Sequence, residues 1–366
     1  MINKNIAVFL PKDSEAMFNR TSKRTFGGAT IHLYHFVKEL YHYTNIYTLL
    51  PEYDTIDFDD ADNFNIIKLY KESDNALLKF MKFYKFIKNY EIDSIMQLGL
   101  TIESCVLAFF CRILGIKFVF FFGHDIESLG YYQNSRKKCI FFPLLIKNSA
   151  LLIAQNEIEK ENILKRYPDI TKVKVLKKGI DLAKIVKVKE KKYDGAWIAR
   201  CDEWKNVESY LKIVSMNKNY NFLLVANPVP GKEEYFNKIK IIASSFKNLT
   251  FYSFVKYEDI YKLLAESKVF FVTSDMEGDW PLTVIEAAAS GVPTISLNYD
   301  YGVLIDVYNA GCFCEGSIEK MNDFFLNLMN DPLLLQKYAQ NAYKFVEDNH
   351  NNKRNATILV EWISSL

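Results

Sequence analysis

The sequence predicts an α/β protein with two Rossmann-like domains, each built on a doubly wound parallel sheet. Its 366 residues exceed one domain of ordinary size. Short runs of β-branched and aromatic residues alternate with segments of helical periodicity along the chain. This alternation stops once, in a segment rich in lysine and valine that follows Asp181. We therefore expect an N-terminal domain over residues 1–182, a C-terminal domain over 183–350, and a last helix over 351–366 that packs back on the N-terminal domain.

The composition is that of a globular protein, with 49% hydrophobic and 25% charged residues. A net charge of +2 argues against a general nucleic-acid binder, which normally carries a strong basic excess. The six cysteines form no C-x-x-C pair, so reduced thiols are expected. The apolar run Ile6–Leu10 is too short for a signal peptide, and charged residues interrupt the apolar segment 105–122. These features predict a cytoplasmic location.

The first domain begins with a strand over Ile6–Leu10 and a polar loop that ends in Gly27-Gly28, where a helix starts. A glycine pair at this place lets the backbone approach a phosphate, although a plain turn fits equally well. Further strands are expected at 45–50, 94–98, 118–122 and 151–154. His124 follows one of them directly, where a doubly wound sheet places ligand contacts; a histidine held by a local turn is the alternative.

A helix is predicted over residues 75–90, with four lysines spaced three residues apart: Lys79, Lys82, Lys85 and Lys88. Intervals of three drift slowly around a helix, so these lysines form a slanting basic stripe beside an aromatic one. An amphipathic surface helix explains the pattern. Peripheral contact with an anionic membrane is the functional alternative.

The second domain repeats the alternation. Strands are expected at 195–199, 222–226, 249–254 and 269–272, and again from Thr294; helices are expected at 232–246, 257–267, 282–290, 318–331 and 333–347. Polar loops with charged residues follow the strands at 195–199 and 269–272. Their carboxyl ends meet at one edge of a parallel sheet, which is where such sheets bind ligands.

The stretch Ser274–Ile295 is the most informative part of the chain. It follows a buried strand and opens a helix behind Pro281, so helical N–H groups there favour an anion such as a phosphate. Glu277 precedes the helix and Glu286 lies one turn inside it. The simplest interpretations are that Glu277 only lies near a helix terminus and that Glu286 is a solvated helix residue. Against the second, Glu286 is followed by three alanines in an apolar helix, where a lone acid needs a polar partner.

Five segments occur in an order typical of one enzyme family. They are Gly27-Gly28, Gly123-His124-Asp125, Lys178-Gly179-Ile180-Asp181, Ala199-Arg200 with Lys205, and Glu277-Gly278 through Glu286-Ala287 to Gly291-Val292-Pro293. On these residues most of the chain resembles the retaining glycosyltransferases of family 4, which have the GT-B architecture. The resemblance implies an acceptor-side N-terminal domain and a nucleotide-sugar-binding C-terminal domain that face a central crevice.

The resemblance also implies the donor, a nucleotide diphosphate sugar carrying UDP or GDP, with no metal and no further cofactor. Arg200 and Lys205 would neutralise the diphosphate, which gains negative charge as the sugar leaves. Glu286 would bind the ribose hydroxyls, and Glu277 would hold the donor sugar or its developing charge. His124 would bind the sugar from the first domain and help place the acceptor. Because the departing phosphate takes the acceptor's proton in such enzymes, no separate base is required.

Further donor contacts are expected from loop and backbone groups: Gly27, Gly28, Asp279, Trp280, Leu282 and Thr283. The implied function is transfer of a hexose to a glycan or a lipid-linked acceptor at the inner membrane face, in polysaccharide or glycolipid synthesis.

One departure from the family pattern lies in the central stretch, where eight residues separate Glu277 from Glu286 and the family has seven. A catalytically silent, sugar-nucleotide-binding partner subunit is therefore an alternative. An oxidoreductase is a weaker one, because no G-x-G-x-x-G follows the first strand.

Overall fold

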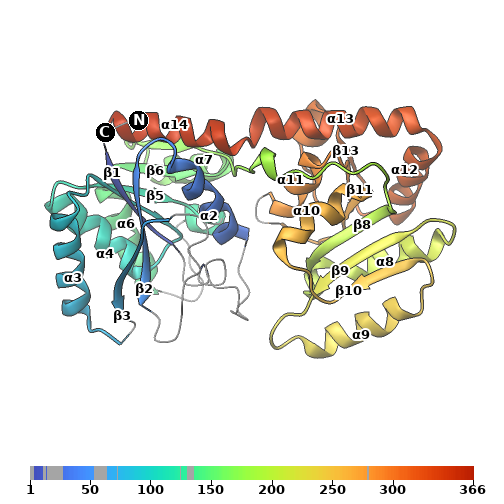
Figure 1. The fold of residues 1–366 in the computed structure, drawn as a ribbon, viewed down its shortest axis with the longest axis horizontal. Helices are drawn as coiled ribbons and strands as arrows, with labels where there is room; N and C mark the ends of the chain where they lie inside the picture. Colours follow the sequence, from blue (N-terminus) through green and yellow to red (C-terminus); the bar gives the residue numbers. More distant parts are fainter. Residues whose placement is uncertain are drawn as a thin grey trace. The chain divides into compact units, whose positions relative to one another are not determined.

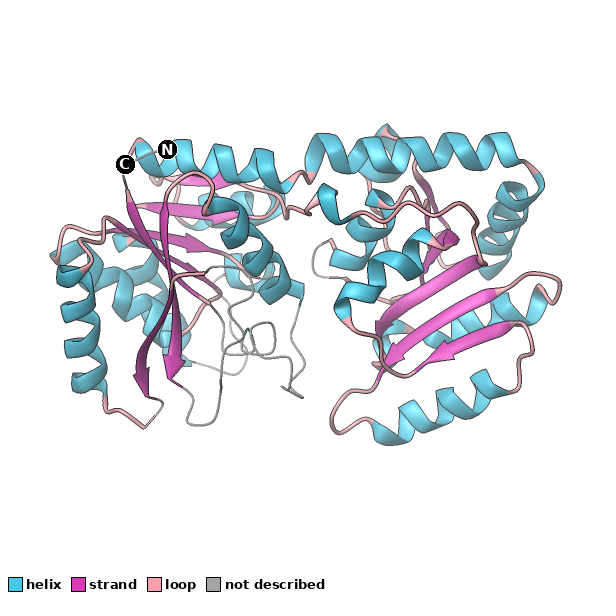
Figure 2. Cartoon of the chain, in the orientation of Figure 1, coloured by secondary structure: helices cyan, strands magenta, loops and turns pink. Residues whose placement is uncertain are grey.

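The computed structural model describes residues 4–10, 14, 28–52, 64–71, 73–123, 125–129, 136–277 and 280–366. The chain divides into two compact units (Figure 1). Unit 1 consists of Met1–Gly179 together with Asn352–Leu366, and unit 2 consists of Ile180–Asn351. Each unit is a sheet covered by helices (Figure 2).

Unit 1 contains a sheet whose described strands are all paired in parallel, in the order β3-β2-β1-β4-β5-β6-β7. The strands are β1 (Asn5–Phe9), β2 (Asn45–Glu52), β3 (Ile66–Lys71), β4 (Ser94–Leu98), β5 (Lys117–Phe121), β6 (Leu151–Ala154) and β7 (Val173–Val175). The helices are α2 (Gly28–Leu40), α3 (Ala76–Asn89), α4 (Ile102–Ile113), α5 (Asp125–Ser128), α6 (Arg136–Asn148), α7 (Glu157–Arg166) and α14 (Asn352–Ser364).

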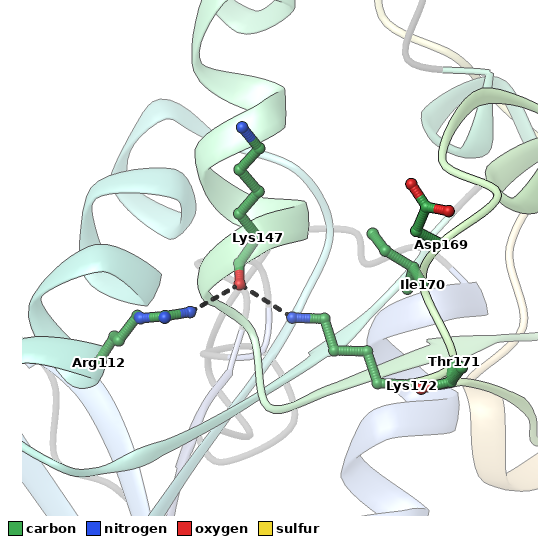
Figure 3. Close-up of a pocket in the computed structure, with 6 residues that line it drawn as sticks. All are labelled: Arg112, Lys147, Asp169, Ile170, Thr171 and Lys172. Carbon is green, nitrogen blue, oxygen red and sulfur yellow. Dashed lines mark hydrogen bonds between the residues drawn. The ribbon is translucent and has the colours of Figure 1, made fainter.

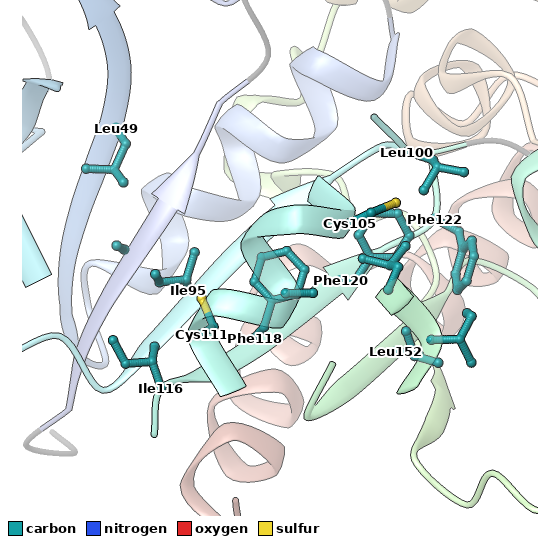
Figure 4. Packing of buried hydrophobic residues seen from close by; sticks show 14 of the residues in the cluster. Leu49, Ile95, Leu100, Cys105, Cys111, Ile116, Phe118, Phe120, Phe122 and Leu152 are labelled. Atoms are coloured by element: carbon teal, nitrogen blue, oxygen red, sulfur yellow. The ribbon is translucent and has the colours of Figure 1, made fainter. Parts of the chain in front are cut away.

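Alternating side chains of the unit 1 strands divide its core between the two faces of the sheet. Phe118 and Phe120 of β5 point to the face that α3, α4, α6 and α7 cover (Figure 4). Val119 and Phe121 point to the other face, against α2 and α14. Strand β5 is therefore apolar on both sides, as expected for a central strand of a parallel sheet.

Unit 2 contains a second parallel sheet, with its described strands in the order β10-β9-β8-β11-β12-β13. The strands are β8 (Tyr193–Arg200), β9 (Phe222–Asn227), β10 (Leu249–Tyr252), β11 (Ser267–Val272), β12 (Thr294–Ser296) and β13 (Gly311–Phe313). The helices are α8 (Val207–Met216), α9 (Glu233–Ser244), α10 (Tyr257–Ala265), α11 (Leu282–Ala289), α12 (Ile318–Asn330) and α13 (Pro332–Asn349), with short helical turns η2 (Leu182–Lys184), η3 (Glu203–Lys205) and η4 (Val303–Val307).

The core of unit 2 is divided in the same way. Ala196 and Ile198 of β8 pack with α10, α11 and α13, whereas Trp197 packs with α8, α9 and α12. Both sheets are thus parallel and covered by helices on both faces, and in each the strand order reverses next to its first strand. This confirms the prediction of two Rossmann-like, doubly wound α/β sheets.

The chain passes between the units twice, at Gly179–Ile180 and at Asn351–Asn352. Within unit 1, α14 packs on α2, and Leu359 and Ile363 enter the apolar cluster of that sheet face. Asn355 donates to the carbonyl of Lys177, at 2.8 Å. The last helix therefore completes the core of unit 1.

Candidate functional site

The candidate site lies at the carboxyl edge of the unit 2 sheet, where the strand order reverses. Strands β8 and β11 are neighbours there, and β9 and β12 continue in opposite directions from them. The loops that follow β8 and β11 consequently leave on opposite sides and open a place for a ligand between them. Arg200 and Lys205 are on the β8 side, and Glu277 is on the β11 side.

Lys205 and Glu277 form an ion pair across this edge. The Lys205 Nζ to Glu277 Oε1 distance is 2.5 Å, and only 12% and 7% of the two side chains are exposed. The same ammonium lies 4.1 Å from the centre of the Trp204 ring. Burial lowers the pKa of Lys205, and Glu277 opposes this effect. This ion pair is therefore largely shielded from water, and it lies where a doubly wound sheet binds ligands.

Hydrogen bonds hold the two loops together behind the ion pair. Thr273 donates to the carbonyl of Lys205 at 2.9 Å and accepts from the Trp197 indole at 2.9 Å. Asp275 accepts from Asn206 at 3.0 Å and from Asn298 at 3.1 Å. Its own N–H donates to the carbonyl of Trp204 at 2.8 Å. These contacts fix the β8 and β11 loops relative to each other, so the charged groups need little reorganisation to act.

Asn206 shows why the β8 loop turns where it does. Its φ of 51° is left-handed, a conformation that asparagine tolerates better than most residues. Its side chain also caps α8 by accepting from the Ser209 N–H. The turn ends η3 at Lys205 and starts α8 immediately afterwards.

Arg200 is the last residue of β8 and lies in a different environment from Lys205. Its guanidinium is 3.1 Å from Asp202, and 64% of the side chain is exposed. It is nevertheless near enough to Lys205 to help lower the pKa of that ammonium. The two predicted cations are therefore neighbours, one buried in an ion pair and one open to solvent.

Glu286 is buried in unit 2, with 1% of the residue exposed. Its Oε1 accepts a hydrogen bond of 2.7 Å from the Tyr257 hydroxyl, which lies 3.1 Å from that of Tyr261. Burial raises the pKa of Glu286 to about 7, and the bond from Tyr257 acts in the opposite direction. Burial also raises the pKa of Tyr257, so this phenol stays protonated. The interpretation of Glu286 as a solvated helix residue is wrong, because the polar partner that its apolar helix required is Tyr257.

The first turn of α11 lies next to Glu277 in sequence. Pro281 is its N-cap and makes no side-chain capping bond, and Leu282 and Thr283 are partly exposed. Trp280 has a packing role, with its ring 5.1 Å from the rings of Tyr301 and Phe345. At the other end Gly291, with a φ of 66°, ends the helix.

The predicted contacts of unit 1 are mostly outside the described residues, and so is one contact of unit 2. Gly27, His124 and Asp279 are in this group, and Gly28 is described as the first residue of α2. Beside the place of His124, the Gly123 N–H donates to the Glu127 carboxylate at 2.7 Å. The same carboxylate accepts from the Leu100 N–H at 2.9 Å. Glu127 therefore connects the ends of β4 and β5.

Several residues of the site did not stand out in the sequence. Tyr257 is far from Glu286 along the chain, and an aromatic residue at the start of a helix carries no signal of its own. Asp275 and Asn206 were visible only as polar loop residues. A weak signal existed for Thr273, a polar residue directly after an apolar strand, where ligand loops begin.

A hollow of about 400 Å³ lies in unit 1, lined by Arg112, Lys147, Asp169, Ile170, Thr171 and Lys172 (Figure 3). Arg112 and Lys172 both donate to the carbonyl of Lys147, at 3.2 and 3.0 Å. These cations satisfy carbonyls at the end of α6, so the cluster has a structural explanation.

Among the residues that the structure describes, no three His, Cys, Asp or Glu side chains gather as metal ligands would. Of the helices in the described ranges, none has both the length and the apolar character needed to cross a bilayer.

A comparison with protein families gives a match for the part of the chain that contains the Lys205–Glu277 ion pair. Residues 178–345 match the family described as Glycosyl transferases group 1. This part of the chain is therefore similar to group 1 glycosyltransferases. The match includes Arg200, Lys205, Glu277 and Glu286.

Two curated relatives support this family. Over 313 residues the chain is 22% identical to an uncharacterized glycosyltransferase of Methanocaldococcus jannaschii, and the match covers 80% of each chain. Over 247 residues it is 24% identical to the poly(glycerol-phosphate) alpha-glucosyltransferase of Bacillus subtilis. That match covers 62% of this chain and 35% of the Bacillus protein.

Among solved structures, the fold resembles that of HepE from Anabaena, a structure in complex with UDP. The TM-score is 0.77 at 15% identity, and the alignment covers 99% of this chain and all of the other. The same protein has been solved with UDP-glucose. At this identity the likeness concerns the fold alone, and it confirms two Rossmann-like domains like those of GT-B structures.

Proposed function

We propose that the protein is a metal-independent, retaining glycosyltransferase of family 4. It moves a hexose from a nucleotide diphosphate sugar to a glycan or lipid-linked acceptor. The observation that carries the proposal is the Lys205–Glu277 pair, which lies at the strand reversal of a group 1 glycosyltransferase domain. UDP is the first nucleotide to test, because HepE was solved with UDP and with UDP-glucose.

The chemistry follows from where charge develops during transfer. The sugar ring becomes positive and the departing diphosphate becomes more negative as their bond breaks. Arg200, which is open to solvent, and Lys205, held nearby, supply two fixed cations to the diphosphate. The N–H groups of Leu282 and Thr283, at the N-terminus of α11, provide further hydrogen-bond donors for the phosphates.

The carboxylates act on the two other parts of the donor. Glu277 accepts hydrogen bonds from the hydroxyls of the donor sugar or stabilises its positive charge, because it lies beside Lys205, the cation that contacts the phosphates. Glu286 binds the ribose hydroxyls once its Oε1 no longer accepts the hydrogen bond from Tyr257. His124, Gly27, Gly28 and Asp279 complete the donor contacts that the resemblance implies. The departing phosphate takes the proton of the acceptor.

A second candidate is a catalytically silent subunit that binds the sugar nucleotide. The eight residues between Glu277 and Glu286, one more than in the family that the chain resembles, favour it. The same residues would then bind the donor without transferring the sugar.

We place the acceptor reaction at a membrane surface. The basic helix α3 supports this location: Lys85 and Lys88 are exposed on it, whereas Lys82 is paired with Asp74 at 2.7 Å. Synthesis of a polysaccharide or glycolipid on a lipid-linked acceptor fits such a location.

The proposal is tested by a thermal-shift screen followed by turnover. A ligand that binds the folded state raises the melting temperature in proportion to its affinity and concentration. UDP, GDP and their hexose conjugates should be compared with UMP, which lacks the second phosphate that the cations bind. The proposal requires a shift with a nucleoside diphosphate that is larger than with UMP. A shift without hydrolysis or transfer of the sugar would favour the silent subunit.

A chelator separates the metal-independent mechanism from a metal-bound diphosphate. We expect EDTA to leave turnover unchanged. If EDTA abolished turnover and a divalent ion restored it, Arg200 and Lys205 would not be the main phosphate cations.

A further inference from the structure

Unit 1 exposes rows of apolar side chains on three helices. Helix α3 exposes Leu77, Met81 and Tyr84, α4 exposes Val106, Phe109 and Ile113, and α6 exposes Ile140 and Leu144. In each row the spacing is three or four residues, which places the members on one side of their helix. We refer to these eight residues as the apolar rows.

The three helices belong to one layer. Their inner sides, including Phe83, Cys105 and Phe142, enter the same apolar cluster against one face of the sheet. The ring of Phe80 on α3 lies 4.5 Å from that of Phe110 on α4, and α4 packs on α6. Because the inner sides share one core, the apolar rows lie on the outer surface of the layer.

The same helices carry a local excess of positive charge. Helices α3, α4 and α6 contain nine Lys or Arg and one acid, Glu103, and therefore have a net charge of +8. The whole chain has a net charge of +2, so the remaining residues sum to −6. A basic surface with exposed apolar side chains combines the two features by which proteins bind anionic bilayers.

We propose that the outer surface of α3, α4 and α6 docks on an anionic lipid bilayer. The apolar rows enter the boundary between headgroups and acyl chains, and the surrounding lysines and arginines contact the headgroups. The proposal extends the location given by the proposed function from one basic helix to a three-helix surface with inserted side chains. It rests on that function in one respect, that the acceptor is carried on a membrane.

A second copy of the chain fits this surface less well. Pairing the layer with itself would bring +8 against +8, and like charges across an interface disfavour association. An acidic protein would satisfy the charge, and it is distinguished from lipid by the experiment.

The test measures binding of the full chain to vesicles by flotation. Vesicles of phosphatidylcholine with equal phosphatidylglycerol are compared with phosphatidylcholine alone, at low and high salt. We expect binding to the anionic vesicles, weaker at high salt because the headgroup attraction is screened. Replacing two apolar residues on different helices, Met81→Ser with Ile113→Ser, should weaken this binding about tenfold or more.

Matched variants control for exposure and charge. Ile113 and Ile241 are exposed to similar extents, 62% and 71%, and Ile241 is on α9 of unit 2. Ile241→Ser should therefore change vesicle binding less than about twofold, and a loss equal to that of Ile113→Ser would overturn the assignment. Lys85→Glu should weaken binding to anionic vesicles, whereas Lys240→Glu on α9 should not.

Other results of the vesicle and sedimentation experiments would contradict the lipid-docking proposal. Equal binding to both vesicle types, or no binding to either, contradicts the proposal. Self-association in sedimentation that Ile113→Ser abolishes would instead identify the surface as an interface between copies. The melting temperature of each variant and its shift with UDP are measured in parallel. A variant that keeps the wild-type nucleotide shift but loses vesicle binding supports the docking surface. Failure of both UDP and GDP to shift the wild type contradicts only the proposed function.

Discussion

The two glutamates of the candidate site lie in opposite electrostatic surroundings. Glu277, in the loop after β11, has the Lys205 ammonium at 2.5 Å. Glu286, inside α11, is also buried, but its hydrogen-bond donor is the neutral phenol of Tyr257. One carboxylate is compensated by a full charge, and the other only by a dipole.

This difference affects how each carboxylate responds to its surroundings. The ion pair places a full positive charge beside Glu277 and holds Lys205 at the strand reversal. The charge of Glu286 depends on pH, because burial raises its pKa to about 7. Its affinity for ribose hydroxyls should depend on pH in the same range, since an ionised carboxylate accepts hydrogen bonds more strongly.

The largest effect is expected from breaking the ion pair. Lys205→Ala should lower turnover about a hundredfold or more, because the phosphates lose a fixed cation. It should also cost about 3 kcal/mol of stability, since Glu277 remains buried without its partner. Steady-state kinetics and urea unfolding measure the two effects.

Arg200→Ala is the matched control for this loss of stability. Its guanidinium is 64% exposed, so the stability cost should stay below about 1 kcal/mol. Turnover should nevertheless fall as in Lys205→Ala. Normal turnover in Arg200→Ala would remove this arginine from the mechanism.

The second effect concerns the pH dependence of stability. The pKa of Glu286 is raised from 4.5 to about 7, so the folded protein binds a proton more tightly than the unfolded chain. Stability should therefore fall as pH rises through this window, by about 3 kcal/mol in all, and this contribution then stays constant. Glu286→Gln should remove that fall and be more stable than wild type at pH 8. Urea unfolding at pH 5 and pH 8 measures it, and identical pH profiles for the two proteins would contradict the buried, shifted carboxyl.

The groups facing Glu286 limit what else could titrate there. Tyr257 and Tyr261 of α10 lie closest, and their pKa values are raised by burial, so both stay neutral at pH 8. Asp181 is near Tyr261. Asp181→Asn serves as the control and should keep the wild-type pH profile.

A smaller effect is expected from Tyr257→Phe. Loss of the hydroxyl removes the hydrogen bond that lowers the pKa of Glu286, so this pKa should rise further. UDP affinity at pH 7 should then fall about tenfold, and raising the pH should restore it. Calorimetric titrations at pH 7 and pH 9 test this, and equal loss at both pH values would indicate a merely structural role for Tyr257.

The smallest effect is expected between the two glutamates, at Trp280. Its ring packs on Tyr301 and Phe345 in the unit 2 core. Trp280→Phe should cost about 1 kcal/mol and leave the UDP-induced thermal shift unchanged. A lost shift at unchanged stability would return Trp280 to the donor contacts that the sequence predicted.

The sequence predicted the elements of the fold well because its signals are local. The apolar run Phe118–Phe121 and the helix after Pro281 are specified by neighbouring residues. Contacts between distant segments carry no such signal. The bonds from Tyr257 to Glu286 and from Asn206 to Asp275 join residues that only the folded sheet brings together.

The prediction for α3 shows the same limit on a surface. Its lysines were visible as a stripe, but the pairing of Lys82 with Asp74 and the exposure of Met81 depend on how the helix is rotated on the sheet. On α4, Val106, Phe109 and Ile113 are likewise exposed, although they belong to an apolar segment. A single helix pattern does not distinguish apolar residues that face the core from those that face outward across a wide apolar arc.

The return of α14 to unit 1 has a consequence for how the protein is made on the ribosome. Domains usually fold in the order of their synthesis. Here residues 352–366 complete the first unit, and they follow every residue of the second. Until they emerge, the sheet face formed by Val119 and Phe121 lacks Leu359 and Ile363. Unit 2 can therefore mature first, while unit 1 still exposes an incomplete apolar face.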